Sequence, residues 1–368
     1  MQKNRLFYID FLKAVCAFLI CLFHFQIQFM NDGYIGWHCQ PEAAANPYLA
    51  YFNAFPYSLT VNTSFRLPLF FAIVGFLPAL FLFRDSNVNH LYKEARIRYF
   101  RFFPLIFISC VISFSLIKCG LIDFHSYFLA TGNEWFRARE DFDYNFFTLI
   151  KEIFFYSYIR GTQFVSPLWC MGYIFIGSYL VYAFLLMFGL LRRRWPFYVA
   201  VAVFAILYDS WYLSFILGII AADFSVNHAP LNTAKGIFLV LLGISISLFP
   251  QVLLPEFIDI NILTASGAFL ILIGMHSNLQ NPKIYKSKFI EWCSRESFSL
   301  IVIQNLVQFS LNTILYLYFN KMGMDVSLNI ALQFIINILA TALITHIYSG
   351  TITPLTQRIC NFADSHLR

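Results

Sequence analysis

The sequence predicts an all-α integral membrane protein with about ten transmembrane helices in one bundle and both termini in the cytoplasm. Three observations support this prediction: a sparsely charged composition, a series of long apolar runs, and an uneven distribution of Lys and Arg between the runs. Of 368 residues, 59% are hydrophobic and only 12% are charged, whereas soluble domains carry about 25% charge. Because lipid offers no partner to an unpaired backbone group, segments buried in a bilayer must be helices or closed barrels.

Ten apolar runs are expected to cross the bilayer, and a spanning helix needs about 20 mostly apolar residues. The fifth and sixth runs are short, so they are expected to be tilted or partly re-entrant. Pro104, Pro196 and Pro250 are expected near span ends, where proline is tolerated. Lys13 interrupts the first run and no small-residue cleavage site follows, so this run is expected to be a span and not a signal peptide. The runs are 12–30, 66–83, 102–118, 168–190, 196–208, 211–223, 236–254, 262–275, 297–319 and 329–349.

The basic residues predict the orientation of these spans. Seventeen Lys and Arg residues fall in one set of loops and seven in the other, while Lys13 lies inside the first span. Positively charged loops stay on the cytoplasmic side, so both termini are expected there, and an even number of spans is required. This clustering at span ends also accounts for the net charge of +6, which therefore does not indicate nucleic-acid binding. The chain 1–368 is expected to form one domain.

Two long outer segments, 31–65 and 119–167, are rich in aromatic residues and include Trp37. Within the second, 144–158 is expected to form an interfacial or re-entrant helix and not a span. The aromatic side chains either stack on sugar rings or form a belt at the membrane surface, and both interpretations remain open. Cys39 and Cys119 fall on the same outer side, so a disulfide between them is possible. No Cys/His spacing typical of zinc is present, and no metal is expected.

Three ionisable residues in the first span are the leading candidates for chemistry. Asp10, Lys13 and His24 occupy a segment in which charge is costly, which makes each a functional candidate. Lys13 and His24 are eleven residues apart, close to three helical turns, so they share one face and lie roughly 16 Å apart. Asp10 precedes Lys13 by one turn and would neutralise it. The structural alternatives are snorkelling for Lys13 and an interhelical hydrogen bond for His24.

An arginine cluster precedes the third span. It consists of Arg96, Arg98 and Arg101, of which the last two share a helix face. Guanidinium groups suit phosphate oxygens, so the cluster is a candidate phosphate clamp. The alternative is a purely topological role, because cytoplasmic arginines are common.

The order of several motifs resembles acyltransferase family 3, a family of membrane O-acyltransferases that act on bacterial surface glycans. The first span carries an Arg/Lys-x10-His pattern as Lys13 and His24, and the R-x-x-R pattern is carried by Arg98 and Arg101. A tryptophan-containing span is centred on Trp169. The similar segments are RLFYIDFLKAVCAFLICLFHF, FFAIVGFLPALF, RIRYFRFFP, PLWCMGYIFIGSYLVY, SFILGIIAAD and SRESFSLIVIQNLV.

Three positions depart from the family pattern. Val74 replaces the usual serine before Gly75, Ile174 stands where many members have glutamate, and Gln304 stands where many have histidine. These differences point to a divergent branch and bear on the acceptor and on proton handling.

The resemblance implies transfer of an acyl group, usually acetyl, from acyl-coenzyme A to a hydroxyl of a cell-surface polysaccharide or lipid-linked sugar at the bacterial cytoplasmic membrane. Arg98, Arg101 and Arg96 would hold the phosphates of acetyl-CoA, with Lys13 assisting and Asp10 beside it. His24 would act as general base or carry the acyl group covalently, and the two remain open. Trp169 and Trp37 would contact the acceptor.

The main rival interpretation is a transporter or flippase for a lipid-linked sugar. It would use Lys13 and His24 as a proton or ion relay. Against it, the sequence has no inverted repeat and no pair of Gly/Pro-broken spans in matched positions.

Overall fold

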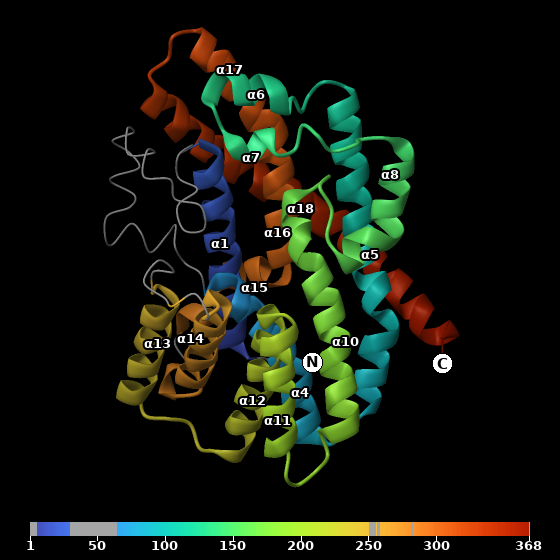
Figure 1. The fold of residues 1–368 in the computed structure, drawn as a ribbon, viewed down its shortest axis with the longest axis vertical. Helices are drawn as coiled ribbons and strands as arrows, with labels where there is room; N and C mark the ends of the chain where they lie inside the picture. Colours follow the sequence, from blue (N-terminus) through green and yellow to red (C-terminus); the bar gives the residue numbers. More distant parts are fainter. Residues whose placement is uncertain (1–5, 30–64, 250–254, 256–257, 281–282, 368) are drawn as a thin grey trace.

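The computed structural model describes residues 6–29, 65–249, 255, 258–280 and 283–367. This part of the chain is 84% helix and contains no β-strand, as Figure 1 shows. It has seven helices long and apolar enough to cross a membrane, and three shorter apolar helices of 10–17 residues. The protein is thus all-helical, and its long apolar helices indicate a multi-pass membrane protein.

The seven long segments include three that contain a short non-α stretch. Such stretches of 3-10 and π-helix are short by nature, and π-turns are frequent at functional sites. The long segments are α1 (Phe7–Phe29), α4 (Arg66–Asp85), α5 (Asn89–Lys118), η3 (Ser166–Cys170) with α10 (Met171–Phe188), η4 (Ser210–Tyr212) with α12 (Leu213–Asn227), α16 (Ser297–Val307) with η8 (Gln308–Asn312) and α17 (Thr313–Lys321), and α18 (Val326–His366). The shorter apolar helices are α11 (Trp195–Tyr208), α13 (Thr233–Ser247) and α14 (Ile260–Met275).

The remaining short helices form two groups along the chain. One group follows α5 and includes the aromatic segment 144–158, which is helical as expected and is not among the candidate spans. The other group precedes α16. They are α6 (Phe124–Thr131), α7 (Glu134–Arg137), α8 (Phe146–Lys151), η2 (Glu152–Tyr156), α9 (Ser157–Ile159), η6 (Asn278–Gln280), η7 (Lys283–Lys286) and α15 (Lys288–Arg295).

Each of the ten apolar runs overlaps a helix, and the helix bounds differ most in α5 and α18. The end of the seventh run, with Pro250, lies outside the described residues. α5 begins at Asn89, so the arginine cluster is helical and Pro104 lies inside the helix, not near its end. α18 continues to His366 and also contains a proline, Pro354. The apolar pattern marks the part of a helix suited to lipid. The helix itself continues through charged residues such as Glu, Lys and Arg, which have good helix propensity.

α4 and α12 approach closely because both carry glycine at their contact. A Cβ atom on Gly75 would collide with the carbonyl oxygen of Phe215, and one on Gly218 would collide with the carbonyl oxygen of Ala72. Small residues at helix contacts allow the backbones to come together, which favours association in lipid. This contact fixes the start of α4 next to the start of α12.

α18 packs against the bundle through polar side chains, while its other faces expose Leu, Ile and Val. Its buried positions from 329 to 345 recur every four residues and so lie on one face. Asn312 on η8 donates to the Gln333 side chain at 3.0 Å and backbone at 2.8 Å, and accepts from Asn337 at 3.1 Å. We call this contact the amide seam; its members are Asn312, Asn329, Gln333, Asn337, Thr341 and Thr345.

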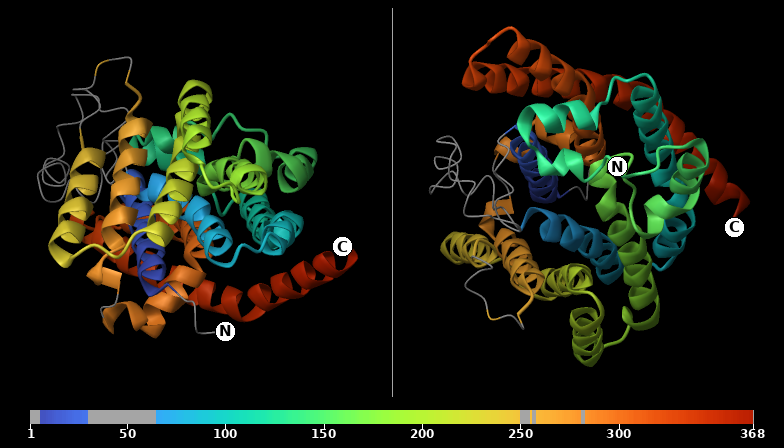
Figure 2. Two further views of the ribbon diagram at one scale, coloured as in Figure 1. Left: turned by 90° about the horizontal axis from the view of Figure 1, so that it is seen from below. Right: turned by 45° about the horizontal axis from the view of Figure 1, so that its top comes forward.

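The continuous helix α16–η8–α17, which contributes Asn312 to the amide seam, also holds α1. Gln28 donates to the Gln308 carbonyl oxygen at 2.9 Å and to Thr313 at 3.1 Å, and Gln304 donates to the Cys21 carbonyl oxygen at 3.2 Å. The middle and end of α1 are therefore fixed by the same helices that dock α18. Figure 2 shows the last part of α18 projecting beyond the bundle.

Candidate functional site

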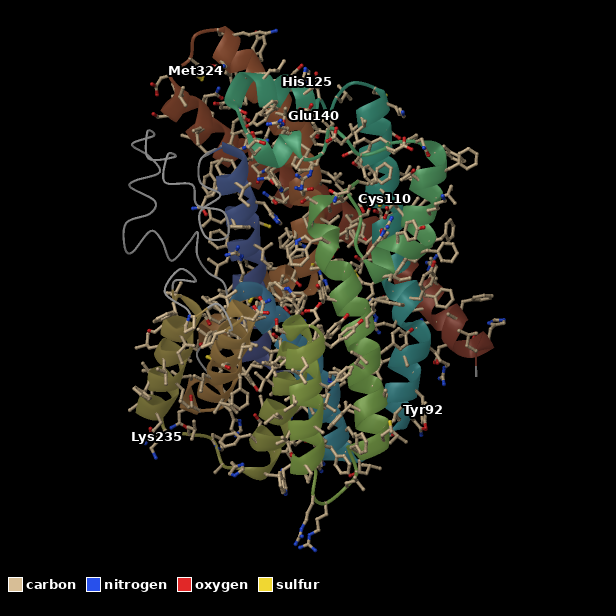
Figure 3. The ribbon with its side chains drawn as sticks, in the orientation of Figure 1. Tyr92, Cys110, His125, Glu140, Lys235 and Met324 are labelled. Carbon is tan, nitrogen blue, oxygen red and sulfur yellow. The ribbon has the colours of Figure 1, made fainter. Side chains whose placement is uncertain are left out.

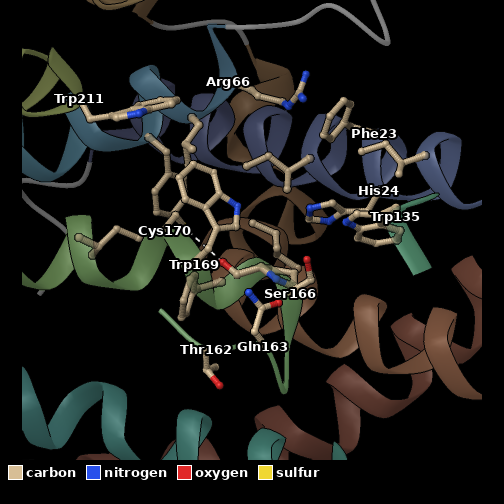
Figure 4. A pocket seen from close by; sticks show the side chains of 18 of the residues that line it. Phe23, His24, Arg66, Trp135, Thr162, Gln163, Ser166, Trp169, Cys170 and Trp211 are labelled. Atoms are coloured by element: carbon tan, nitrogen blue, oxygen red, sulfur yellow. Dashed lines mark hydrogen bonds between the residues drawn. The ribbon is translucent and has the colours of Figure 1, made fainter. Parts of the chain in front are cut away.

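A cavity of about 530 Å³ lies beside α1 and is lined by residues from segments far apart in the sequence (Figure 4). Its walls combine three tryptophans with polar and charged side chains. We call it the His24 cavity. The lining residues used below are His24, Arg66, Trp135, Arg139, Thr162, Gln163, Ser166, Trp169, Trp211, Asn261 and Phe298.

Several helices begin at this cavity. Arg66 is the first residue of α4, Ser166 the first of η3, Trp211 belongs to η4, and Asn261 is the second residue of α14. Helix N-termini present unsatisfied N–H groups and a partial positive charge. Asp209 and Asp259 cap η4 and α14, whereas α4 and η3 have no side-chain cap.

The His24 side chain reaches the cavity from α1 and is 7% exposed. Its ring lies parallel to the Trp135 indole, with centroids 6.2 Å apart and an interplanar angle of 9°. Its Nδ1 atom is buried and has no hydrogen-bond partner in the described chain. The ring is thus held by stacking and by a side-chain interaction with Gln304, and its Nδ1 atom faces no protein partner among the described residues.

Arg139 lies against the same indole. Its guanidinium carbon is 4.4 Å from the Trp135 ring centroid, a cation–π distance. It donates to Ser166 Oγ at 2.6 Å and to the Trp135 carbonyl oxygen. Arg66 lies over the Phe23 ring at 3.9 Å. Two guanidinium groups are therefore fixed at the cavity by aromatic rings.

The described lining residues carry positive charge only. They include Arg66, Arg139 and the titratable His24, and they contain neither Asp nor Glu. Charged groups in a water-poor cavity interact more strongly than in bulk water. The described part of the wall thus combines cationic groups with flat aromatic faces, and Arg66 and Arg139 both have further interactions within the protein.

The structure brings only part of the expected site together. His24 and Trp169 line the cavity, and Trp169 is 41% exposed. Lys13 and Asp10 lie towards the start of α1 and are not among the lining residues; Asp10 accepts a hydrogen bond from Ser294 at 2.6 Å. Trp37 and Cys39 lie outside the described residues.

The arginine cluster is engaged within the protein. Arg98 is 8% exposed and donates to Ser178 Oγ at 2.5 Å. Arg101 forms two hydrogen bonds to the Glu94 carboxylate, at 2.6 and 3.0 Å, and none of the cluster lines the His24 cavity. The physical reason is that α5 extends back through the cluster, which places these side chains against α10 and α18.

Two aromatic rings separate this cluster from the cavity. The Arg98 guanidinium lies 4.7 Å from the Phe102 ring centroid. Phe102 packs edge-on against Phe298 with centroids 6.0 Å apart, and Phe298 lines the cavity.

A second, basic hollow of about 550 Å³ is formed by the start of α5 and the end of α18. It contains His90, Lys93 and Arg96, with Asp364 paired to Arg96 at 2.7 Å. Figure 3 places Tyr92, which also lines it, at the end of the molecule opposite His125 and Glu140. This hollow lies at the end that the positively charged loops assign to the cytoplasm.

A buried carboxylate lies behind the cavity wall. Glu152 is 2% exposed, begins the π-turn η2, and interacts with Thr162, which lines the cavity. Burial raises the pKa of Glu152 above its usual range, against an opposing effect of Arg160 at 3.7 Å. Its Oε2 has no hydrogen-bond partner in the described chain.

Sequence reasoning missed most of the cavity residues, among them two arginines, two tryptophans and an asparagine. Arg66 and Arg139 were counted only as charges that set topology, and Trp135 only as one aromatic residue in an outer segment. Trp211 and Asn261 carried no signal, because their position depends on where helices start in space. In the described chain no group of three or more His, Cys, Asp or Glu residues is arranged to hold a metal.

Comparison with known proteins identified no relative of this chain. No family model matches the chain, no curated protein matches it, and no solved structure matches it. The resemblance to acyltransferase family 3 therefore stays a prediction that rests on the motifs alone.

Proposed function

We propose that this protein is a membrane O-acyltransferase that moves an acyl group, acetyl in the first instance, from acyl-CoA to a hydroxyl of a surface glycan or lipid-linked sugar. The observation that carries the proposal is the buried His24 imidazole at the wall of a large, tryptophan-lined cavity. Aromatic faces suit sugar rings, and an imidazole can both accept and return a proton in acyl transfer.

The proposed topology has ten spans with both termini in the cytoplasm. The three shorter apolar helices complete the ten. In this orientation the basic hollow at His90, Lys93 and Arg96 faces the cytosol, where acyl-CoA is found. Its cationic side chains suit the phosphates of the donor nucleotide, and Lys13 and Asp10 lie at the same end of α1.

The chemistry requires one proton transfer to the base and one from it. The His24 imidazole accepts the proton of the acceptor hydroxyl as that oxygen attacks the thioester carbonyl carbon. The tetrahedral intermediate collapses with cleavage of the carbon–sulfur bond, and the coenzyme A thiolate takes the proton from the imidazolium. The pantetheine arm would reach the cavity past Phe102 and Phe298, the rings between the arginine cluster and the cavity.

The first test uses acetyl-CoA with the purified full-length protein in detergent, supplied with extracted surface glycan. Release of free coenzyme A is measured together with the acyl mass gained by the glycan. We expect His24→Ala to abolish both while the protein stays folded. His125→Ala is the matched control, since His125 is exposed and paired with Glu140 at 3.1 Å, and it should retain full transfer.

The second test separates donor binding from chemistry. Arg98→Ala and Arg101→Ala should weaken acetyl-CoA affinity if the cluster contributes to the donor site. Unchanged affinity in both would remove Arg98 and Arg101 from that site. A transporter for a lipid-linked sugar would leave acetyl-CoA intact in every variant, and wild-type transfer by His24→Ala would reject the proposed base.

A further inference from the structure

α16 and α18 face each other through a polar contact that the proposed chemistry leaves unused. The two helices lie side by side (Figure 1). Two hydrogen bonds fix their antiparallel register: Asn337 donates to Asn312 at 3.1 Å, and Ser349 donates to Glu296 at 2.9 Å. The buried side chains between these two bonds therefore lie in one interface.

Four buried side chains in this stretch have polar atoms without a hydrogen-bond partner in the described chain. They are at most 5% exposed, and the atoms are Asn305 Nδ2, Gln308 Nε2 and Oε1, Thr341 Oγ1 and Thr345 Oγ1. The amide orientation of Asn305 is fixed, because its Oδ1 accepts from the Ser166 backbone N–H at 3.2 Å. The NH2 group of Asn305 is thus the unpartnered end.

The two threonines differ from others on the same helix. A threonine within a helix commonly donates to the carbonyl oxygen four residues earlier, as Thr351 and Thr356 do at 2.8 and 2.9 Å. Thr341 and Thr345 make no such bond among the described residues. Their hydroxyls are therefore left for a partner outside their own helix.

Ordered water is the partner that fits this set of atoms. Almost all buried polar groups are hydrogen-bonded to protein or to ordered water, and a buried water makes about three hydrogen bonds. The set mixes NH2 donors with carbonyl and hydroxyl acceptors, and water satisfies both because it donates and accepts. A metal cation would leave the NH2 groups without an acceptor, and neither 297–311 nor 338–348 contains Asp or Glu.

One end of this stretch reaches the proposed base. Gln304 lies one helical turn before Gln308 and so on the same face of the helix. Its side chain interacts with the His24 ring, and its NH2 group donates to the Cys21 carbonyl oxygen at 3.2 Å. The polar stretch thus continues to the wall of the His24 cavity.

The other end reaches the surface at Glu296. Tyr348 interacts with the Ser299 hydroxyl and with the Glu296 carboxylate. Glu296 is 2% exposed, but its partner Arg295, at 3.1 Å, is half exposed. Two hydroxyls, a buried carboxylate and a guanidinium in contact with solvent therefore lie at this end.

We propose that the contact between α16 and α18 holds a chain of ordered waters, and that His24 exchanges its proton with solvent along this chain. The transfer moves one proton from the His24 imidazolium to solvent at Arg295 and leaves each water, each hydroxyl and the Glu296 carboxylate as it was. It returns the imidazole to the neutral form that a base requires at the start of a turnover. This role rests on the proposed function, whereas the waters themselves require no acyl donor.

The waters can be detected without any substitution. Water-edited magic-angle-spinning NMR of the isotope-labelled full-length protein in liposomes transfers magnetisation from water to the side chains that contact it. The side-chain amide signals of Gln308 and Asn305 are compared with that of Asn312, which is equally buried but donates to Gln333. We expect the first two to build up at least about threefold faster, because ordered water contacts them. Build-up as slow as that of Asn312 would overturn the water chain.

A matched pair of variants tests the proton role. Thr345→Val removes a buried hydroxyl at nearly constant volume, and Thr351→Val makes the same change at an exposed position of the same helix. We expect Thr345→Val to lower the turnover of acetyl-CoA about fivefold or more and to raise its solvent deuterium isotope effect, because one missing link interrupts the whole network. Thr351→Val should change neither quantity. Turnover that falls in Thr345→Val with an unchanged isotope effect would reveal a merely structural hydroxyl and overturn the proton role.

Failure of the two proposals is distinguishable. Fast build-up at Gln308 in a protein that consumes no acetyl-CoA would retain the water chain and lose the acyltransferase assignment. Acyl transfer that depends on His24, with build-up at Gln308 no faster than at Asn312, would retain the transferase and lose the water chain.

Discussion

Removal of one amide at the centre of the amide seam should loosen the C-terminal helix and, through it, the position of His24. Asn312 is fully buried and takes part in three hydrogen bonds with α18, at 2.8, 3.0 and 3.1 Å. Interhelical hydrogen bonds in membranes average about 0.6 kcal/mol, which gives about 2 kcal/mol for three. Because Asn312→Ala also leaves the Asn337 amide without its acceptor in a buried place, an unsatisfied-group penalty of about 1–3 kcal/mol applies. We expect a total loss of about 3–5 kcal/mol in the free energy of unfolding.

The assay is a titration of the purified protein from mild detergent into SDS, followed by circular dichroism and tryptophan fluorescence. Asn320→Ala is the matched control, since Asn320 lies at the exposed end of α17, and surface substitutions usually stay within about 0.5 kcal/mol. The same preparation should lose part of its acyl transfer, because α1 is held by Gln304 and Gln308 of the helix that carries the seam. If the two Asn→Ala variants unfold at the same SDS fraction, the amide seam does not hold α18.

Three further changes test the packing and the site. Gly218→Ala should destabilise the protein by about 1–3 kcal/mol through overpacking against the Ala72 backbone, whereas Gly350→Ala, with no atom within 4 Å of its Cβ, should be neutral; equal melting temperatures would contradict the close contact. Glu152→Gln tests the pH dependence of stability that this carboxyl contributes. Burial raises the folded-state pKa of Glu152, so the carboxyl of the unfolded chain ionises at lower pH than that of the folded protein. The free energy of unfolding of the wild type should therefore fall as pH rises from about 4.5 towards the folded-state pKa. The glutamine variant should show a flatter pH profile, and parallel profiles would exclude this contribution. Trp135→Leu should remove the ring contacts of His24 and Arg139, and such contacts are each worth about 0.5–1.5 kcal/mol. The rate of acyl transfer should therefore fall about tenfold or more while the protein stays folded. Full activity of this variant would show that the indole does not position the imidazole.

The helices could be predicted from the sequence because their signal is local. Apolar runs of roughly span length locate ten helices without knowledge of their neighbours. Helix ends were harder to predict, since α5 and α18 extend through charged or polar residues that form helix without being apolar. The amide seam was missed for a related reason: Asn329, Gln333 and Asn337 lie four apart in a segment whose overall hydropathy is that of a span.

The candidate site could be predicted only where the signal lies within the sequence of a single helix. His24 was identified because an ionisable side chain inside an apolar run is unusual whatever surrounds it. Arg66 and Arg139 are separated by 73 positions, and they line the same cavity only because α4 starts beside the segment that carries α7. For the arginine cluster the sequence was less informative. Its spacing predicts a phosphate clamp, but nothing in the sequence indicates that Arg101 binds Glu94 and that Arg98 binds Ser178.

The Phe102–Phe298 pair lies between the Arg98 guanidinium and the His24 cavity, and under the proposed function this position constrains the route of the donor arm. The basic hollow at Arg96 is accessible from one end, while the His24 cavity is lined by the starts of helices that run towards that same end. A donor held by its phosphates in the hollow and an acceptor held in the cavity would meet only where the two aromatic rings now touch. Their edge-on contact involves no hydrogen bond, so its separation costs about 0.5–1.5 kcal/mol beyond the apolar area exposed. A thin acyl-pantetheine arm would replace that area with its own, whereas water and ions would not. If the proposed function holds, this aromatic pair is therefore the place at which an acyl chain would enter the His24 cavity.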